Sequence, residues 1–321
     1  MSKVDMVRRA LEASHAVELV LLEERYGWPS IVGNNAIDAG ARFAIHIAPV
    51  GDFHRNPNEM RFQNPGSNRP VSDDDGIPVL LGIEDSEEPI LLVAADAQSR
   101  VGRTTRFSVR IEKSMIPKAR QEGAAVFTNG SGERITAFRA EFLPSFLAAT
   151  AAGYELPATR LNEISDASGL RDENTDAAAE RARRAASILI RDQTFGAKVR
   201  DAYGHRCAMC GLAAGLTVGA HIYPASAPGS PYTTDNGVCL CENHHRAYDA
   251  FKIWFDPATF EIRVHPDVIA EAGGDPYLKA FLDVTFDTLK VPTDPAKKPS
   301  AQYVNQRRQY FDKDYDWLGN T

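Results

Sequence analysis

Two pairs of metal-binding side chains lie in one short part of the chain. Cys207 and Cys210 form a C-x2-C pair, and Cys241 and His244 repeat the two-residue gap as C-x2-H. Each pair presents both ligands from one tight turn, and the long spacer lets the pairs converge on one ion from different elements. Structural zinc takes four such ligands, so the pattern predicts a structural zinc site that stabilises a module with little core of its own.

Cys239 is an alternative ligand for the same ion. It lies two residues before Cys241, and side chains two apart on an extended strand point to the same face, so either thiol could bind zinc. The C-x2-H spacing favours Cys241. Cys239 is then expected to be a small buried hydrophobic residue.

Three further residues of this stretch are of types that a structural zinc does not require. His221 could act as a base, because a neutral imidazole accepts a proton near neutral pH. His245 follows His244 at the start of an expected helix, where successive side chains point about 100° apart, so it can face a second metal site or be a buried helix-cap residue. Asn236 lies in the turn-forming residues 234–237, where bracing a turn is the alternative role.

The order and spacing of these residues resemble the HNH nuclease family. The matching pieces between residues 206 and 256 read AHIYP, DNGVCLC and ENHHRAYD. The resemblance implies a ββα-metal fold in which a strand carries His221, a loop carries Asn236 and a helix carries His245. It further implies that His221 is the general base, oriented by a backbone carbonyl, and that His245 binds the catalytic ion. Asn236 would either bind that ion or brace the loop that carries the base.

One position departs from the family pattern. Many HNH nucleases place an Asp or His before the general base as a metal ligand, whereas this chain has Ala220. Asp249 lies four residues after His245 on the same helical face and could supply an oxygen ligand, or be a surface carboxylate. We expect the catalytic ion to be Mg²⁺, Mn²⁺ or another divalent ion. Imidazole binds transition ions better than it binds Mg²⁺, so several ions should be tolerated. Arg246 could clamp the scissile phosphate or form a surface salt bridge.

Composition limits the class of protein. The 321 residues suffice for two domains, and 43% are hydrophobic, as in globular proteins. The absence of an 18-residue apolar run and of a signal-peptide pattern predicts a cytoplasmic protein with reduced thiols and no membrane contact. The net charge of −7 argues against coating nucleic acid by bulk electrostatics, so any DNA contact must be local.

Hydrophobic periodicity predicts an α+β chain. Residues 1–153 should form a β-rich domain with flanking helices, beginning with one long or two short helices over 1–27. Residues 154–176 are polar and are predicted to be a linker. Residues 177–321 should hold the zinc-stapled ββα module with added helices, the first of them broken near residues 193–196. A terminal helix over 302–312 would turn Gln306, Arg307 and Arg308 toward a partner or DNA.

The first domain also resembles the accessory domain found beside restriction-associated nucleases and methylases, through residues 60–64, 78–82, 92–96 and 137–142. This resemblance implies DNA recognition, plausibly by a curved sheet. A basic stretch at residues 100–120 has seven basic residues against one acid. Its first four arginines could contact phosphates or a guanine edge, or simply decorate the surface: Arg100, Arg103, Arg106 and Arg110.

The sequence therefore predicts a metal-dependent DNA endonuclease of restriction type, whose first domain selects a site in double-stranded DNA. The resemblance implies 5′-phosphate and 3′-hydroxyl ends, and a homodimer is expected because one module cuts one strand. A second hypothesis is a modification-dependent enzyme in which Phe53, Phe62 or Phe127 holds a flipped base. A third is a zinc-stapled DNA-binding regulator without catalysis.

Overall fold

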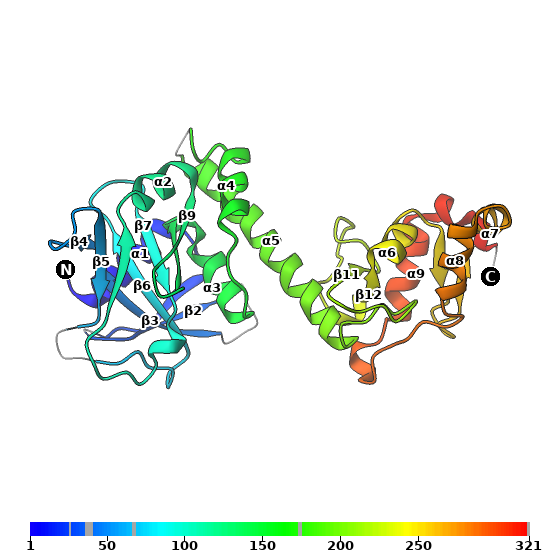
Figure 1. Cartoon of the computed structure of the whole chain (residues 1–321), viewed down its shortest axis with the longest axis horizontal. Coiled ribbons are helices and arrows are strands. Elements are labelled where there is room, and N and C mark those ends of the chain that lie inside the picture. The colour runs from blue at the N-terminus through cyan, green and yellow to red at the C-terminus, as the bar shows by residue number, and fades with distance from the viewer. Residues whose placement is uncertain (26, 36–40, 66–68, 173–174, 320–321) are drawn as a thin grey trace. The chain divides into compact units, whose positions relative to one another are not determined.

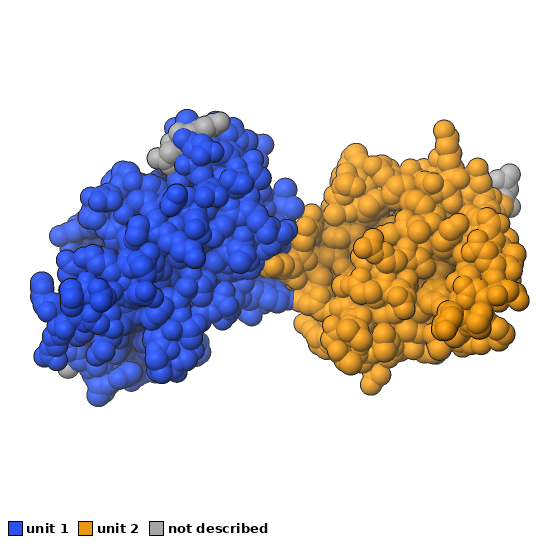
Figure 2. All heavy atoms as spheres, turned by 45° about the horizontal axis from the view of Figure 1, so that its top comes forward, with its two compact units in different colours: residues 1–190 blue, residues 191–321 orange. Residues whose placement is uncertain are grey.

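A computed structural model describes the chain except residues 26, 36–40, 66–68, 173–174 and 320–321. The chain divides into two compact units, Met1–Ile190 and Arg191–Thr321, which Figure 2 colours separately. Both mix helices and strands, which confirms the predicted α+β class. Within the described residues, every helix is too short or too polar to cross a lipid bilayer.

A seven-stranded sheet forms the centre of the first unit (Figure 1). Its strand order is β1-β2-β3-β6-β7-β10-β9; β3 and β6 pair in parallel, and the other neighbours are antiparallel. The strands are β1 (Leu19–Glu23), β2 (Ser30–Asn34), β3 (Arg42–Pro49), β6 (Ile77–Glu84), β7 (Leu91–Ala95), β9 (Ala124–Thr128) and β10 (Arg134–Arg139).

Both faces of this sheet are covered. Along β7, Leu92 packs into one hydrophobic core and Leu91 and Val93 pack into the other, because successive strand residues point to opposite faces. The first core includes residues of α1 (Lys3–Ser14), α3 (Leu143–Ala151), α4 (Ala158–Ala167) and α5 (Asp176–Ala202). The second includes residues of α2 (Met115–Glu122) and of a small sheet made by β4 (Gly51–Asp52), β5 (Glu59–Gln63) and β8 (Ser108–Glu112).

Two segments of the first unit differ from the sequence-based expectation. Helix α1 ends at Ser14, because His15 adopts a left-handed conformation with φ of 52°, and a strand follows where a helix was expected. In residues 154–176, predicted as a linker, α4 forms and Leu161 and Leu170 lie fully buried in the first core. The boundary between the compact units falls after Ile190, within helix α5.

The second unit is built around a two-stranded hairpin and a helix. Strands β11 (Thr217–His221) and β12 (Gly237–Cys241) pair antiparallel, and α6 (Glu242–Asp249) follows directly. A second hairpin is formed by β13 (Ile253–Phe255) and β14 (Ile262–Val264). The remaining helices are α7 (Pro266–Ala272), α8 (Pro276–Val284) and α9 (Ala301–Tyr310). Short 3₁₀ helices precede β12 (Thr234–Asn236), lie between α8 and α9 (Pro295–Lys297) and follow α9 (Asp312–Leu318).

Candidate functional site

The four predicted zinc ligands lie together in the second unit. The ligand atoms of Cys207, Cys210, Cys241 and His244 all lie within 4.8 Å of one another. The Sγ atoms of Cys210 and Cys241 are 3.9 Å apart, and His244 Nδ1 lies 3.1 Å from Cys241 Sγ and 3.7 Å from Cys207 Sγ. A tetrahedron with Zn–S bonds of about 2.3 Å has edges of about 3.8 Å, so the geometry is compatible with zinc.

The contacts of His244 set its orientation toward this cluster. The hydroxyl of Thr285 donates to the Phe281 carbonyl at 2.8 Å, so its oxygen accepts from Nε2–H of His244 at 3.0 Å. That tautomer leaves the lone pair of Nδ1 directed at the sulfur atoms, as a metal-binding histidine requires. Burial, with a smaller contribution from the charge of Cys207, raises the pKa of Cys210 to about 12. Burial also raises the pKa of Cys241, whereas contacts with His244 and with backbone N–H groups outweigh burial at Cys207 and lower its pKa to about 6, so Cys210 and Cys241 are the thiols that need a cation to become thiolates.

The hairpin separates the cysteine cluster from His221. Cys241 pairs with Thr217 at one end of the two strands, and His221 pairs with Gly237 at the other. Helix α6 begins at the Cys241 end, with His244 in its first turn. The cluster can therefore fix the start of the helix without touching His221.

His221 is held by aromatic side chains. Its ring stacks on Phe195 with centroids 3.7 Å apart and an interplanar angle of 16°, and Tyr232 meets it edge-on at 5.1 Å. Its Nε2 is buried and has no hydrogen-bond partner among the described residues. The expectation that a backbone carbonyl orients this ring is therefore wrong for Nε2; stacking orients it instead. Burial lowers the pKa of His221 to about 4, which keeps the imidazole neutral at physiological pH.

Helix α5 lies directly on the hairpin because Gly219 and Gly237 have no side chains there; a Cβ on Gly237 would lie 2.3 Å from Val199 Cγ2 in the helix. A Cβ on Gly219 would lie 2.6 Å from the carbonyl oxygen of Gly196 in the helix, closer than real contacts allow. The predicted helix break near residues 193–196 is absent, since α5 is continuous there. Cys239 is fully buried against Phe195 and Val199 in this contact, apart from the cysteine cluster.

The side chain of Asn236 is occupied by the loop that follows β11. Its Nδ2 donates to the carbonyls of Tyr223 at 3.1 Å and Pro231 at 2.9 Å and to the hydroxyl of Ser230 at 3.2 Å. Its Oδ1 accepts from the backbone N–H of Tyr223 at 2.8 Å. Asn236 is also fully buried. These contacts match the bracing role and leave no free amide atom for a metal.

His245 and Asp249 meet on one face of α6, as their spacing predicts. Nε2 of His245 lies 3.2 Å from Oδ2 of Asp249, and both side chains are partly exposed. In the described part of the chain, the cysteine cluster is the only group of three or more ligand atoms close enough to hold an ion. His221 therefore does not join these two residues in a compact cluster. Arg246 is exposed.

Arg307 was predicted to face a partner or DNA, but it is buried inside the second unit. It is 3% exposed, and its guanidinium lies 4.0 Å from the ring centroid of Tyr248. Nη1 donates to the carbonyl of Ile222 at 3.2 Å, directly after His221, and Nη2 donates to the carbonyl of Tyr248 at 3.0 Å. Nη2 also lies 4.0 Å from Oδ1 of Asp249. Arg307 thus joins the His221 end of the hairpin to the end of α6, and does not face a partner.

The arginines predicted to contact DNA have different environments in the first unit. Arg100 is 8% exposed and forms two hydrogen bonds to the carboxylate of Glu133, at 2.7 and 2.9 Å. The ion pair explains its burial, and Arg100 is therefore structural rather than a DNA contact. Arg103, Arg106 and Arg110 are exposed.

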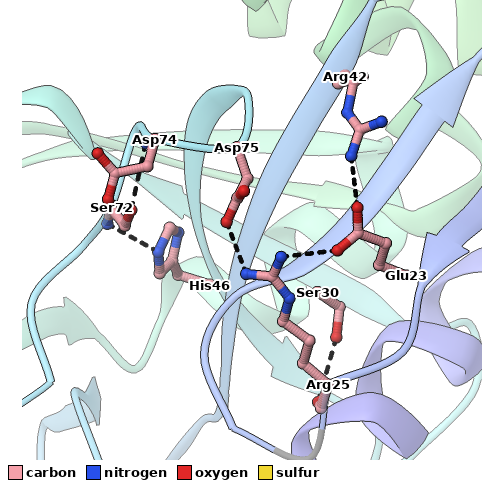
Figure 3. Close-up of polar contacts among 8 residues, drawn as sticks. All are labelled: Glu23, Arg25, Ser30, Arg42, His46, Ser72, Asp74 and Asp75. Atoms are coloured by element: carbon pink, nitrogen blue, oxygen red, sulfur yellow. Dashed lines mark hydrogen bonds and ion pairs between the residues drawn. The ribbon is translucent and has the colours of Figure 1, made fainter.

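The acidic residues 73–75 lie in a loop that ion pairs and hydrogen bonds hold in place (Figure 3). Asp75 binds Arg25 at 2.6 Å, and Arg25 and Arg42 share the carboxylate of Glu23. The loop is also held by His46, whose Nε2 accepts from the backbone N–H of Ser72 at 3.0 Å. Burial lowers the pKa of His46 to about 4, so the ring is neutral and can accept this bond.

Comparisons with known proteins found matches to parts of the chain. Among solved structures, the modification-dependent TagI restriction endonuclease is similar over 84% of this chain and 81% of its own, with 14% identity and a TM-score of 0.32. No curated protein matches the chain. Residues 42–147 match the methylase-associated X1 family, and residues 207–256 match the HNH endonuclease family. The chain therefore joins a methylase-associated X1 domain to an HNH endonuclease domain.

Proposed function

We propose that the protein is a metal-dependent DNA endonuclease of restriction type, in which the first unit selects the site and the second cuts. The observation that carries the proposal is the neutral imidazole of His221, held by Phe195 at the end of an HNH hairpin. The buried Nε2 of His221 has no hydrogen-bond partner among the described residues, and an unpaired buried nitrogen costs stability. Folding alone therefore does not explain a histidine at this position.

His221 acts as the general base in this proposal. Hydrolysis of a phosphodiester requires a water molecule that loses a proton as it attacks phosphorus, and a neutral imidazole accepts that proton. The stack on Phe195 fixes the plane of the ring, and because Nε2 is buried, Nδ1 is proposed to accept the proton. The low pKa keeps His221 ready to accept a proton over a wide pH range.

His245 and Asp249 are proposed to hold the catalytic divalent ion. Their imidazole nitrogen and carboxylate oxygen approach to 3.2 Å on a partly exposed face, and this donor set fits Mn²⁺ and related ions better than Mg²⁺. A bound ion would supply positive charge to the scissile phosphate and the departing oxygen. Arg246, exposed on the same helix, is proposed to contact the phosphate, and phosphate oxygens and water complete the coordination.

Asn236 is proposed to brace the loop behind the base. Its four hydrogen bonds to residues 223–231 support this role over metal binding. The cysteine cluster is proposed to bind structural zinc and to set the position of α6 relative to the hairpin. One module cuts one strand, so double-strand cleavage needs two copies of the chain.

A plasmid-nicking assay with Mg²⁺ or Mn²⁺ tests the proposal. We expect His221→Ala and His245→Ala to fold, to bind DNA and not to cut. The matched control is His205→Ala, because His205 forms the same i,i+4 contact with Asp201, at 3.1 Å, on an exposed helix end. DNA binding without cutting by the wild-type chain under every divalent ion would instead identify a regulator. Parallel digestion of methylated and unmethylated plasmid decides whether modified bases are required.

A further inference from the structure

Two arginines lie side by side on the outer face of the small sheet β4-β5-β8. Arg61 of β5 and Arg110 of β8 are directly opposed in the strand register. Their neighbours Phe62, Val109 and Ile111 point inward and are buried. Directly opposed like charges destabilise a sheet, and neither arginine forms an ion pair among the described residues. Folding alone does not explain this pair.

Phe53 keeps both guanidinium groups on the surface. Its ring lies 4.9 Å from the guanidinium carbon of Arg61 and 5.1 Å from that of Arg110. A contact of this kind orients a cation without neutralising it, as a carboxylate would. The two positive charges therefore remain available to an external anion.

Further polar groups extend this surface along β5. Gln63 accepts a hydrogen bond from Nη2 of Arg106 at 3.1 Å, which places a third exposed guanidinium at the end of the same strand. A hollow of about 480 Å³ adjoins the pair and is lined by Lys3, Arg61, Gln63 and Asn64, among others. The arginines thus form a line, and a line of cations suits a polyanion better than a single small anion.

Among the residues that the structure describes, carboxylates lie at the border of this surface without forming ion pairs with Arg61 or Arg110. Glu59 and Glu112 form the next opposed pair of β5 and β8, two residues from the arginines. Asp52 of β4 is taken by Lys113 at 2.8 Å. Positive and negative charges are therefore separated along the sheet, with the arginines toward the Gln63 end.

We infer that Arg61, Arg110 and Arg106 bind successive phosphates of double-stranded DNA, which makes the outer face of β4-β5-β8 the surface that holds the substrate. The inference rests on the proposed function, because it takes DNA as the substrate. Binding of phosphates would also relieve the repulsion between Arg61 and Arg110. Arg61 does not belong to the basic stretch of residues 100–120, and only the strand register brings it to Arg110.

The test is DNA affinity measured over a salt series by fluorescence anisotropy, with a duplex probe and the His221→Ala chain to prevent cutting. The variant is Arg61→Ala/Arg110→Ala. The control is Arg160→Ala/Arg184→Ala, which removes the same charge from exposed residues paired with Glu163 and Glu180. We expect the first variant to bind at least about tenfold more weakly and to lower the salt slope by about two, since each phosphate contact contributes about 0.9. The control should change neither quantity appreciably.

Two further readouts separate the possible failures. The melting temperature of Arg61→Ala/Arg110→Ala should stay within about 3 °C of that of the parent chain. The variant loses the cation–π contacts with Phe53, but it also loses the repulsion between the two arginines, and the two effects offset each other. Phe53→Leu removes the ring that orients both guanidinium groups, so it should lower affinity by less than the double variant and leave the salt slope unchanged, because both cations remain. A loss as large as that of the double variant would assign the face to a stacked base and overturn the phosphate assignment. Equal affinity and slope in variant and control overturn the inference, while wild-type cutting would leave the proposed nuclease standing.

Discussion

Replacement of Arg307 by methionine tests whether one buried cation holds the two halves of the HNH site together. Methionine is similar in length but removes the donors to the carbonyls of Ile222 and Tyr248 and to the hydroxyl of Tyr315. A buried acceptor left unpaired costs about 1–3 kcal/mol. Because Arg307 is 3% exposed, water cannot replace these bonds without opening the core. We expect the second unit to lose about 3–5 kcal/mol of unfolding free energy.

Chemical denaturation in the presence of zinc measures this cost, with the fluorescence of Trp254 and Trp317 reporting on the second unit. The control is Arg308→Met on the same helix, where the guanidinium donates to the exposed carbonyl of Gly319 and the expected cost is below about 1 kcal/mol. Nicking by Arg307→Met should fall more than DNA affinity, because Ile222 directly follows His221. Equal stability of the two variants would refute the reasoning.

Three further predictions concern the metal, the base and the loop. Removal of zinc by a chelator should unfold the second unit and leave the first folded, because structural zinc supplies about 10–16 kcal/mol of apparent binding free energy; calorimetry would show one transition lost. Protonation of His221 should not slow nicking until the pH falls through about 4, because burial keeps its imidazole neutral above that pH; a titration of the His221 ring followed by NMR with a midpoint near 6.5 would contradict this. Asn236→Asp should inactivate the enzyme as Asn236→Ala does, because a carboxylate cannot donate to the carbonyls of Tyr223 and Pro231; retained nicking by the aspartate variant would favour metal binding by residue 236.

The cysteine cluster was predictable because its geometry is local. Two tight pairs at fixed spacing dictate which atoms can meet, and Cys207 and His244 meet as expected. The i,i+4 contact between His245 and Asp249 follows from helical geometry in the same way. The role of Asn236 stayed open in the sequence, because the carbonyls that surround it come from a loop whose path depends on tertiary packing.

Other features depend on contacts that periodicity does not encode. Val17, Val20 and Leu21 recur near helical spacing, whereas Leu19 and Leu21 fit a two-residue repeat, and the strand pairing with β2 decides between the two. Helix α4 has few large apolar residues, yet Ser165 is fully buried beneath Gly123, so a polar composition concealed a packed helix. Arg307 was expected on the surface because arginine is rarely buried. Only the fold brings the carbonyls of Ile222 and Tyr248 to it.

The two ends of the HNH hairpin are held by different interactions, and the site needs the attachment at each end. At the Cys241 end, the cysteine cluster fixes the first turn of α6, and its strength depends on a metal and on deprotonated thiols. At the His221 end, Arg307 and the stack on Phe195 rely on hydrogen bonds and packing. A helix held at one end alone could pivot, and a shift of about 1 Å at His245 would be enough to slow the reaction about a hundredfold. Loss of either attachment should therefore impair cutting more than DNA binding.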